Sequence, residues 1–238
     1  SCRELEVGEF LYMADDVEIG RGGSTGINSN VKIGKHVGIF EKTIINPSET
    51  VEIGDDVGIG AEVMIWTHGA WLDVLSDFGS VRIGKNVWLP ARCIVLPNVE
   101  IGENTVIGIG SIVNKNIPSG CLAAGSPCKI IKENYYPKQI DEQDKKKLIE
   151  DILKDWHILL KEKNIYFSYQ TRYEDNKIFL REIVDGGCSE IVFDLKSRKI
   201  LQGSHNEVAE DLRDYLRRRG IKIYHDNEFK SIKQEWII

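Results

Sequence analysis

The sequence predicts a β-solenoid, a parallel β-helix of six-residue repeats, followed by a small α+β domain. Three observations support this: an aliphatic residue that recurs every six positions, a glycine that often follows it, and a change of pattern after residue 137. A period of six fits neither an α-helix nor the simple alternation of a flat strand. It fits a short strand plus a turn, repeated so that one aliphatic side chain per repeat points inward.

The repeat extends from about residue 17 to about residue 130. Its spacing is unbroken from Ile33 to Ile45, from Ile53 to Ile65, and from Ile83 to Val113. Small or β-branched residues recur four positions after the aliphatic: Val37, Thr43, Val57, Val63, Val87, Cys93, Val99, Thr105 and Ser111. The glycine after the aliphatic is expected to supply the backbone angles of a corner. Three repeats close a coil of about 18 residues, so about five to six stacked coils are predicted.

Two interruptions break the repeat. Between Ile45 and Ile53 the segment "NPSET" lengthens one step to eight residues, which indicates a two-residue insertion at a corner. After His68, continued repeats would place Trp71 and Asp77 at inward positions. Because an unpaired carboxylate inside an apolar prism is costly, residues 69–80 are expected to leave the solenoid as an excursion loop.

The domain boundaries expected are 1–137 for the β-helix and 138–238 for the α+β domain, whose role the sequence does not specify. Asp141 is expected to be the N-cap of a helix of about 20 residues. Its expected apolar face is Leu148, Ile152, Trp156, Leu159 and Leu160. Strands are expected at 165–173, 177–184 and 190–195, with turns at 185–187 and 196–198. A second helix should carry Val208, Leu212, Tyr215 and Leu216 and end at Gly220, before a last strand over 221–226.

Composition excludes several classes of protein. A net charge of −6 with no basic stripe argues against a nucleic-acid partner. No apolar run reaches the length needed for a membrane span, and no signal peptide is visible. The five cysteines include no C-x-x-C pair, which favours reduced thiols in a cytoplasmic protein. Only His36 and His68 lie in the repeat, so a three-histidine metal centre of the carbonic anhydrase type is excluded and no metal is expected.

His68 is the candidate catalytic residue. It occupies the fourth place of its repeat, where the side chain should face away from the interior, and it borders the excursion loop. A neutral imidazole held by a rigid scaffold can accept a proton from a hydroxyl group. The repeat alone leaves two readings open, a general base or an exposed corner histidine with no role.

The repeats, the break after "WTH", the segment "NVWLPARCIVLPNVEIGENTVIGIGSIV" and the terminal "AAGSPCKIIKE" together resemble the hexapeptide-repeat acyltransferases. The resemblance covers about residues 17–135 and is nearest to the galactoside and maltose acetyltransferases and the polysaccharide O-acetyltransferases. It implies a left-handed parallel β-helix that forms a homotrimer, with active sites between subunits, and that transfers an acetyl group from acetyl-CoA. It also implies that His68 is the catalytic base.

The resemblance extends to binding residues. It implies that the backbone at Ala91 and Ile109 contacts the coenzyme, although the family usually has Ala where Ile109 stands. It places Lys115, Lys129 and Lys132 near the coenzyme phosphates, and Trp88 near the cleft. Alternatively, the three lysines are solvated surface residues without a binding role, and Trp88 packs at a contact between subunits. The remaining candidates are Glu41, Asn46, Trp66, Trp71 and Asp73 for the acceptor, with Glu62 or Asp73 as a partner that orients His68.

The function expected from this resemblance is an acetyl-CoA-dependent O-acetyltransferase acting on a sugar or surface-polysaccharide unit. One alternative is an N-acetyltransferase of an amino sugar or nucleotide-amino-sugar. Such enzymes usually carry a leading nucleotide-binding domain, and no G-x-G-x-x-G motif follows a strand here. The other alternative is a β-helix without catalytic activity that serves as a binding or scaffold module.

Overall fold

The computed structural model describes residues 2–20, 26–69, 78–163, 169–184, 187–203 and 206–224. The chain forms two compact units, Ser1–Lys138 and Gln139–Ile238. The boundary expected from the sequence lies one residue earlier, between residues 137 and 138. Within the described residues, no helix is long and apolar enough to cross a membrane.

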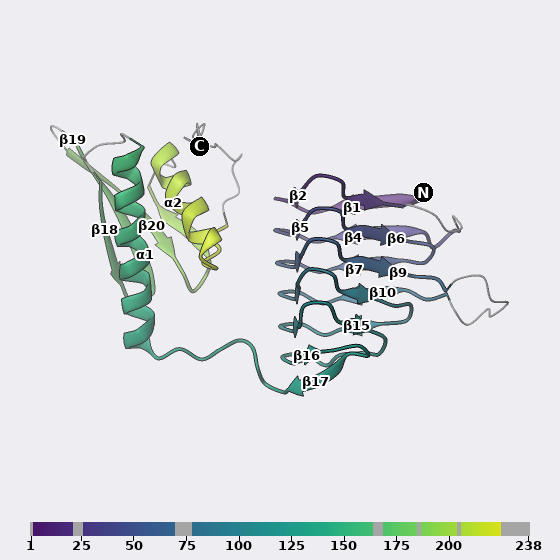
Figure 1. The fold of residues 1–238 in the computed structure, drawn as a ribbon. Helices are drawn as coiled ribbons and strands as arrows, with labels where there is room; N and C mark the ends of the chain where they lie inside the picture. Colours follow the sequence, from purple (N-terminus) through teal and green to yellow (C-terminus); the bar gives the residue numbers. More distant parts are fainter. Residues whose placement is uncertain are drawn as a thin grey trace. The chain divides into compact units, whose positions relative to one another are not determined.

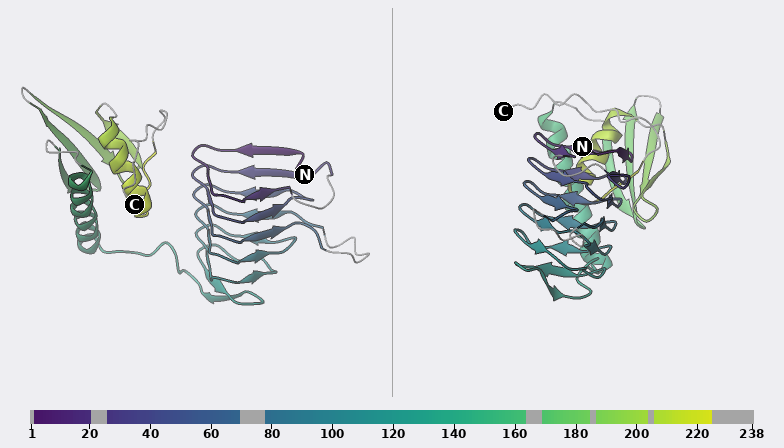
Figure 2. Two further views of the ribbon diagram at one scale, coloured as in Figure 1. Left: turned by 45° about the horizontal axis from the view of Figure 1, so that its top comes forward. Right: turned by 90° about the vertical axis from the view of Figure 1, so that its right-hand side faces the viewer.

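The first unit is a three-sided β-helix, because the chain visits three parallel sheets in turn (Figures 1 and 2). Sheet A contains β1 (Glu4–Val7), β4 (Asn30–Ile33), β7 (Val51–Ile53), β10 (Val81–Ile83) and β13 (Glu100–Ile101). Sheet B contains β2 (Tyr12–Met13), β5 (Gly38–Ile39), β8 (Gly58–Ile59), β11 (Trp88–Leu89), β14 (Val106–Ile107), β16 (Leu122–Ala124) and the antiparallel β17 (Lys129–Lys132). Sheet C contains β3 (Glu18–Ile19), β6 (Ile44–Asn46), β9 (Met64–Trp66), β12 (Ile94–Val95) and β15 (Ile112–Val113).

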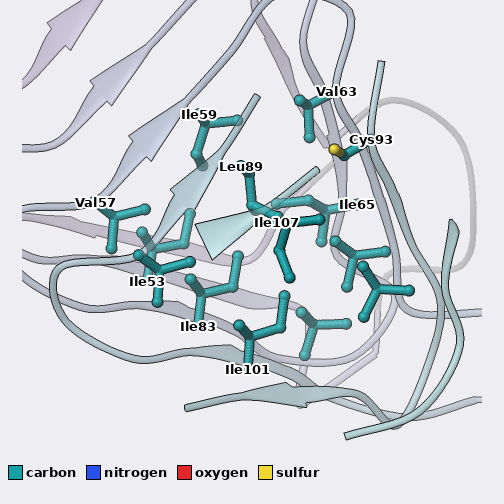
Figure 3. Packing of buried hydrophobic residues seen from close by; sticks show 14 of the residues in the cluster. Ile53, Val57, Ile59, Val63, Ile65, Ile83, Leu89, Cys93, Ile101 and Ile107 are labelled. Carbon is teal, nitrogen blue, oxygen red and sulfur yellow. The ribbon is translucent and has the colours of Figure 1, made fainter. Parts of the chain in front are cut away.

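The predicted inward residues form the core of this unit. Every aliphatic residue of the repeat from Ile33 to Val113 is at most 4% exposed. Equivalent residues pair in register from coil to coil, as Ile53 does with Ile83 and Ile83 with Ile101. Figure 3 shows these side chains gathered inside the prism. The six-residue pattern is confirmed, and the repeat begins earlier than predicted, at β1.

The glycines after the aliphatic residues serve a different purpose from the one predicted. Gly54 is not among the residues with positive φ, whereas Asp56, two positions later, has φ 60°. A Cβ atom on Gly54 would lie 2.7 Å from the backbone nitrogen of Lys85 in the next coil. The prediction that glycine supplies the corner angle is therefore wrong: glycine lets stacked backbones approach closely. The residue two positions later adopts the left-handed conformation, as His36, Asp56, Glu62, Asn86 and Asn104 do.

The connections that lengthen a coil all join sheet C to sheet A. They are residues 20–29, 47–50 and 67–80, and the second contains the predicted two-residue insertion. Around the predicted excursion, His68 and Phe78 form an antiparallel bridge, so the chain returns to the corner that it left. Residues 70–77, the interior of the excursion, lie outside the described residues.

The second unit contains two helices and a four-stranded antiparallel sheet. The helix α1 (Glu142–Glu162) starts at Asp141, whose carboxylate accepts the N–H groups of Gln143 and Asp144. The sheet has the order β18 (Tyr169–Glu174), β19 (Lys177–Val184), β20 (Gly187–Asp194) and β21 (Lys199–Gln202). The helix α2 (Glu207–Arg218) follows, and Gly220 has φ 84° just beyond it.

Three details of this unit differ from the predictions. Leu148 is exposed, and the buried face of α1 is Ile149, Leu153, Trp156 and Leu160. The strand β21 was not predicted. In the described part of 221–226, only an isolated bridge between Tyr224 and Lys199 stands where a last strand was expected.

Candidate active site

His68 lies at the corner between sheets C and A, directly after β9. The residue before it, Thr67, is fully buried and ties this corner to the coil above. Its hydroxyl donates to the Asn46 carbonyl at 2.7 Å and accepts the N–H of Glu49 at 2.9 Å. The backbone that carries the imidazole is therefore held on a rigid part of the solenoid.

The hydrogen bond of the imidazole identifies its tautomer. The Nδ1 atom lies 2.6 Å from the carbonyl oxygen of Gly69. Since a carbonyl only accepts, Nδ1 carries the proton and Nε2 has the free lone pair. Nε2 is buried and has no hydrogen-bond partner within the described residues. Leaving a buried polar atom unpaired is costly, and such an atom in a native structure needs an explanation, which a functional role would provide.

Two aromatic rings border the imidazole. The ring centroid of Trp66 lies 5.7 Å from that of His68, nearly perpendicular at 86°, and that of Phe78 lies 5.9 Å away. Phe78 is anchored because the next residue, Gly79, donates its N–H to the Thr67 carbonyl at 2.9 Å. Sequence reasoning missed both Phe78 and Thr67. The break in the repeat points to the excursion as a whole and does not reveal which residue returns beside His68.

Of the two residues expected to orient His68, Glu62 does not do so. Glu62 is bonded instead to Arg92, with its Oε2 atom 2.9 Å from the guanidinium Nε. This hydrogen bond and the positive charge of Arg92 lower the pKa of Glu62. The Gly69 carbonyl is the partner of the imidazole. The other candidate, Asp73, lies outside the described residues, as does Trp71.

The acceptor candidates divide between two corners. Asn46 pairs with Trp66 in register, so both lie on sheet C next to the corner of His68. The Asn46 side chain is only 1% exposed and lies within reach of the Ser48 hydroxyl, whose oxygen is 3.5 Å from Asn46 Oδ1. Glu41 is exposed and lies between β5 and β6, at the corner between sheets B and C. Within one chain, Glu41 is thus on the opposite edge of sheet C from His68.

The coenzyme candidates also lie away from His68. Ala91 and Ile109 occupy the corner between sheets B and C in adjacent coils, where the Gly110 N–H donates to the Ala91 carbonyl at 3.0 Å. The Ile109 side chain is 74% exposed. Trp88 is exposed on sheet B. Its indole packs against Gly58, and a Cβ atom added to Gly58 would lie 2.5 Å from the indole. Lys115, Lys129 and Lys132 are exposed on the last coil and on β17.

Sheet C separates the two groups of candidates, and its outward row is apolar from β6 to β15, below Glu18 on β3. Ile44, Met64, Ile94 and Ile112 follow one another in register along this row, and each is half-buried. The outward row of sheet A is charged instead, with Lys32 paired to Glu6 at 3.6 Å and Arg82 to Glu52 at 2.8 Å. These two faces of the prism are therefore chemically different: sheet A carries a row of ion pairs, and sheet C carries an apolar row.

The buried thiols show no sign of reactivity. Burial raises the pKa of Cys93, of Cys121 and of Cys128, which disfavours the thiolate. Cys93 and Cys121 lie in the solenoid core. In the part of the chain that the structure describes, no three His, Cys, Asp or Glu side chains are grouped as a metal site would require.

Residues 80–115 match the model of the bacterial transferase hexapeptide family, which comprises six repeats. The chain is 39% identical over 124 residues to the galactoside O-acetyltransferase of Escherichia coli (strain K12), covering 49% of this chain and 58% of that protein. Among solved structures it is similar to a maltose O-acetyltransferase from Clostridium difficile 630, with 30% identity, coverage of 54% of this chain and 68% of that chain, and a TM-score of 0.47. It is also similar to a galactoside acetyltransferase in complex with coenzyme A, with 29% identity, coverage of 58% and 72%, and a TM-score of 0.45.

The chain therefore spans little more than half of the curated relative that it matches. The family model nevertheless falls on the repeat itself, where the stacked coils are built. Residues 80–115 thus carry the repeats of the bacterial transferase hexapeptide family, and the chain is similar to the galactoside O-acetyltransferase of Escherichia coli over 124 residues.

Proposed function

We propose that this protein transfers the acetyl group of acetyl-CoA to a hydroxyl group of a sugar or surface-polysaccharide unit, with His68 as the general base. The observation that carries the proposal is the buried Nε2 atom of His68, which has a free lone pair and no partner within the described residues. The relatives named galactoside and maltose O-acetyltransferase support a sugar as acceptor.

The chemistry needs no nucleophile from the protein, because the thioester is already activated. Nε2 removes the proton of the acceptor hydroxyl while its oxygen attacks the thioester carbonyl carbon. The new C–O bond forms, the C–S bond breaks, and the leaving thiolate takes the proton back from the imidazolium. The Gly69 carbonyl, bonded to Nδ1–H, stabilises the imidazolium in between. A base placed in this way contributes about 10²–10⁴ in rate.

The coenzyme and acceptor would meet between copies of the chain. In one chain, His68 and the coenzyme candidate Ala91 lie at opposite edges of sheet C, so a neighbouring copy has to supply one of them. The apolar row on sheet C gives such a copy a surface to cover. A homotrimer meets both requirements.

The trimer is tested by a single charge in that row. Met64→Glu places a carboxylate in the middle of the apolar surface and is expected to yield monomers in analytical ultracentrifugation. Lys32→Glu, on the outward row of sheet A, is the matched surface control and should leave the trimer intact. Trimers that persist in Met64→Glu would show that sheet C is not the interface.

The remaining candidates would complete the site. Lys115, Lys129 and Lys132 are free to meet the coenzyme phosphates, since all three are exposed. Trp66 would stack on a sugar ring beside His68. Ile109 is the departure from the family pattern, and its exposed side chain would border the coenzyme groove while the backbone makes the contact.

The experiment measures thiol release from acetyl-CoA with a panel of sugars, amino sugars and nucleotide sugars. His68→Ala is expected to lower acceptor-dependent release about a hundredfold or more while coenzyme binding is kept. His36→Asn is the control, because His36 lies in the same solenoid and has φ 54°, which Asn tolerates. Equal activity in the two variants would contradict the role of His68. Release with amino sugars alone would indicate N-acetylation, and a chain that neither binds coenzyme nor releases thiol would be a scaffold.

A further inference from the structure

Phe78 lies beside His68, although the sequence gave no sign of it. The two residues form an antiparallel β-bridge, so they are directly opposite each other where the excursion leaves and rejoins the solenoid. Side chains that are opposite each other in an antiparallel pair emerge on the same side of the backbone and lie close together. The ring of Phe78 is accordingly a fixed neighbour of the imidazole, and the two ring centroids are 5.9 Å apart.

The backbone at Phe78 is held from two sides. Within the same coil, the next residue, Gly79, donates its N–H to the Thr67 carbonyl at 2.9 Å. From the following coil, Asn98 Nδ2 donates to the Phe78 carbonyl at 3.4 Å. The Asn98 side chain also lies so close to Gly79 that a Cβ atom added there would be 1.9 Å from Asn98 Oδ1. The solenoid frame therefore fixes the position of Phe78, which does not belong to the buried core.

The ring of Phe78 remains open in spite of this anchoring, since the residue is 44% exposed. Another phenylalanine–histidine pair in the same solenoid shows what a packed pair looks like. The ring centroids of Phe10 and His36 are 4.7 Å apart, and their planes differ by 17°. Between Phe78 and His68 the separation is 5.9 Å, and the planes differ by 30°. The imidazole beside Phe78 thus covers less of the neighbouring ring than the imidazole of His36 does, which leaves apolar surface for a ligand.

An open aromatic ring at this place suits a pyranose. The faces of a pyranose ring carry C–H groups, which pack against aromatic rings, whereas its hydroxyl groups are arranged around the rim. Because the planes of Phe78 and His68 lie within 30° of each other, a sugar on the face of Phe78 has its rim beside the imidazole. The buried Nε2 atom of His68 has a free lone pair and no partner in the described part of the chain. A hydroxyl group of the rim can supply that partner.

We propose that Phe78 is a substrate-binding residue that selects pyranose acceptors. Its ring packs against the C–H face of the sugar and so presents a hydroxyl group of the rim to Nε2 of His68. The inference rests on the proposed function and deepens it, because it names the class of acceptor. An acyclic polyol offers hydroxyl groups without a flat C–H face and gains nothing from the ring. Since the contact acts on binding, its loss should raise the KM for the acceptor more than it lowers kcat.

Kinetics with two kinds of acceptor test the proposal. Phe78→Leu removes the aromatic face and keeps an apolar side chain. The KM for methyl galactopyranoside and methyl glucopyranoside is expected to rise about fivefold or more, whereas transfer to glycerol should be unchanged. Phe78→Tyr keeps the ring and should retain the KM of the wild type. Phe10→Leu is the matched control, because it removes the ring beside the other histidine and should affect neither acceptor.

A binding measurement separates this inference from the acyl transfer. Saturation-transfer difference NMR detects the C–H protons of a bound methyl pyranoside without turnover, here with coenzyme A present. The signal is expected for the wild type and Phe10→Leu, and should be strongly reduced for Phe78→Leu. Thermal unfolding confirms that each variant folds, and Phe78→Met, which also lacks a ring, replaces Phe78→Leu if it does not. Binding that depends on Phe78 without any thiol release would overturn the proposed acyl transfer and support the present inference.

Three results would overturn the proposal for Phe78. The first is an unchanged KM for the methyl pyranosides in Phe78→Leu. The second is an equal loss of transfer to the pyranosides and to glycerol, which would make Phe78 a structural support of the excursion. The third is an NMR signal of the same strength in the wild type and in Phe78→Leu.

Discussion

The two units of this chain bury polar groups in opposite ways. In the described part of the β-helix, the buried polar side chains are all uncharged: Ser29, Thr43, Asn46, Ser48, Thr67, Thr105 and Ser111. In the second unit they are all charged: Glu210, Asp211 and Arg213. Stacked identical positions would place like charges above one another, so a repeat has to keep charge outside. A core built from unlike elements can hold complementary charges.

The charges of the second unit are satisfied by specific partners. Asp211 accepts the indole N–H of Trp156 at 2.8 Å and is paired with Lys163. Arg213 is paired with Glu210 and donates to the Ile223 carbonyl at 3.1 Å. These contacts join α1, α2 and the segment after α2, which have no common repeat. In this unit, then, the correct packing of elements depends on a few polar contacts.

The largest effect is expected from Asp211→Ala. The substitution leaves the Trp156 N–H and the Lys163 ammonium without their partner. It should destabilise the second unit by about 3 kcal/mol. This is the low end of the range for breaking a buried ion pair, because the Lys163 side chain is 31% exposed. Asp214→Ala on the same helix is the control. Its partners Arg217 and Arg218 are about half exposed, so the cost should be at most about 1 kcal/mol. Urea unfolding followed by tryptophan fluorescence measures the free energy of unfolding of both variants. Equal losses of stability would contradict the distinction between the buried and the exposed ion pairs.

A smaller effect tests the stacking of the β-helix. Gly54→Ala forces a Cβ atom toward the Lys85 backbone and should cost about 2 kcal/mol, as overpacking does. At Gly110 a Cβ atom meets nothing within 4 Å, and the strain at φ 68° alone should cost about 1 kcal/mol. Thermal unfolding of the two variants shows which substitution lowers stability more. A greater loss for Gly110→Ala would show that the backbone angle at a corner is a stricter requirement than close stacking at Gly54.

The smallest effect concerns pH. Burial, with a hydrogen bond of 2.7 Å to Glu182 and the charge of that carboxylate, raises the pKa of Tyr169 to about 12. Since the unfolded pKa is about 10, this contribution to stability is complete below pH 10 and is lost as the pH rises through 12. Glu182→Gln removes the charge and should lower the pKa of Tyr169. Absorbance at about 295 nm follows the titration, and Tyr169→Phe identifies its signal among the eight tyrosines.

The same contrast explains what the sequence could predict. In the β-helix the inward aliphatic positions from Ile33 to Val113 were predicted correctly, because the period repeats them and their burial follows from it. Even there, the purpose of Gly54 required the neighbouring coil, which no single repeat contains. In the second unit, the face of α1 was misplaced at Leu148 because an amphipathic pattern fixes a stripe only to within about one residue. The burial of Asp211 depends on its contacts with Trp156 and Lys163, which the pattern of α2 alone does not reveal.

The candidate site was only partly predictable for a similar reason. His68 was identified by the break in the repeat and by the family resemblance. Its bond to the Gly69 carbonyl and its contact with Phe78 depend on where the excursion leaves and returns. A repeat pattern carries no information on such contacts, since they occur once. The separation of His68 from Ala91 across sheet C likewise follows from the order of the three sheets.

The location of every long connection between sheet C and sheet A has a consequence for how such a protein can diversify. Each coil rejoins the stack through its own aliphatic residue, as Ile83 does after the fourteen positions 67–80. A change of length at this edge is thus absorbed within one coil, and the register of all later coils is preserved. Evolution or an experimenter can therefore change the length or sequence of such a connection while the frame that carries His68 stays the same.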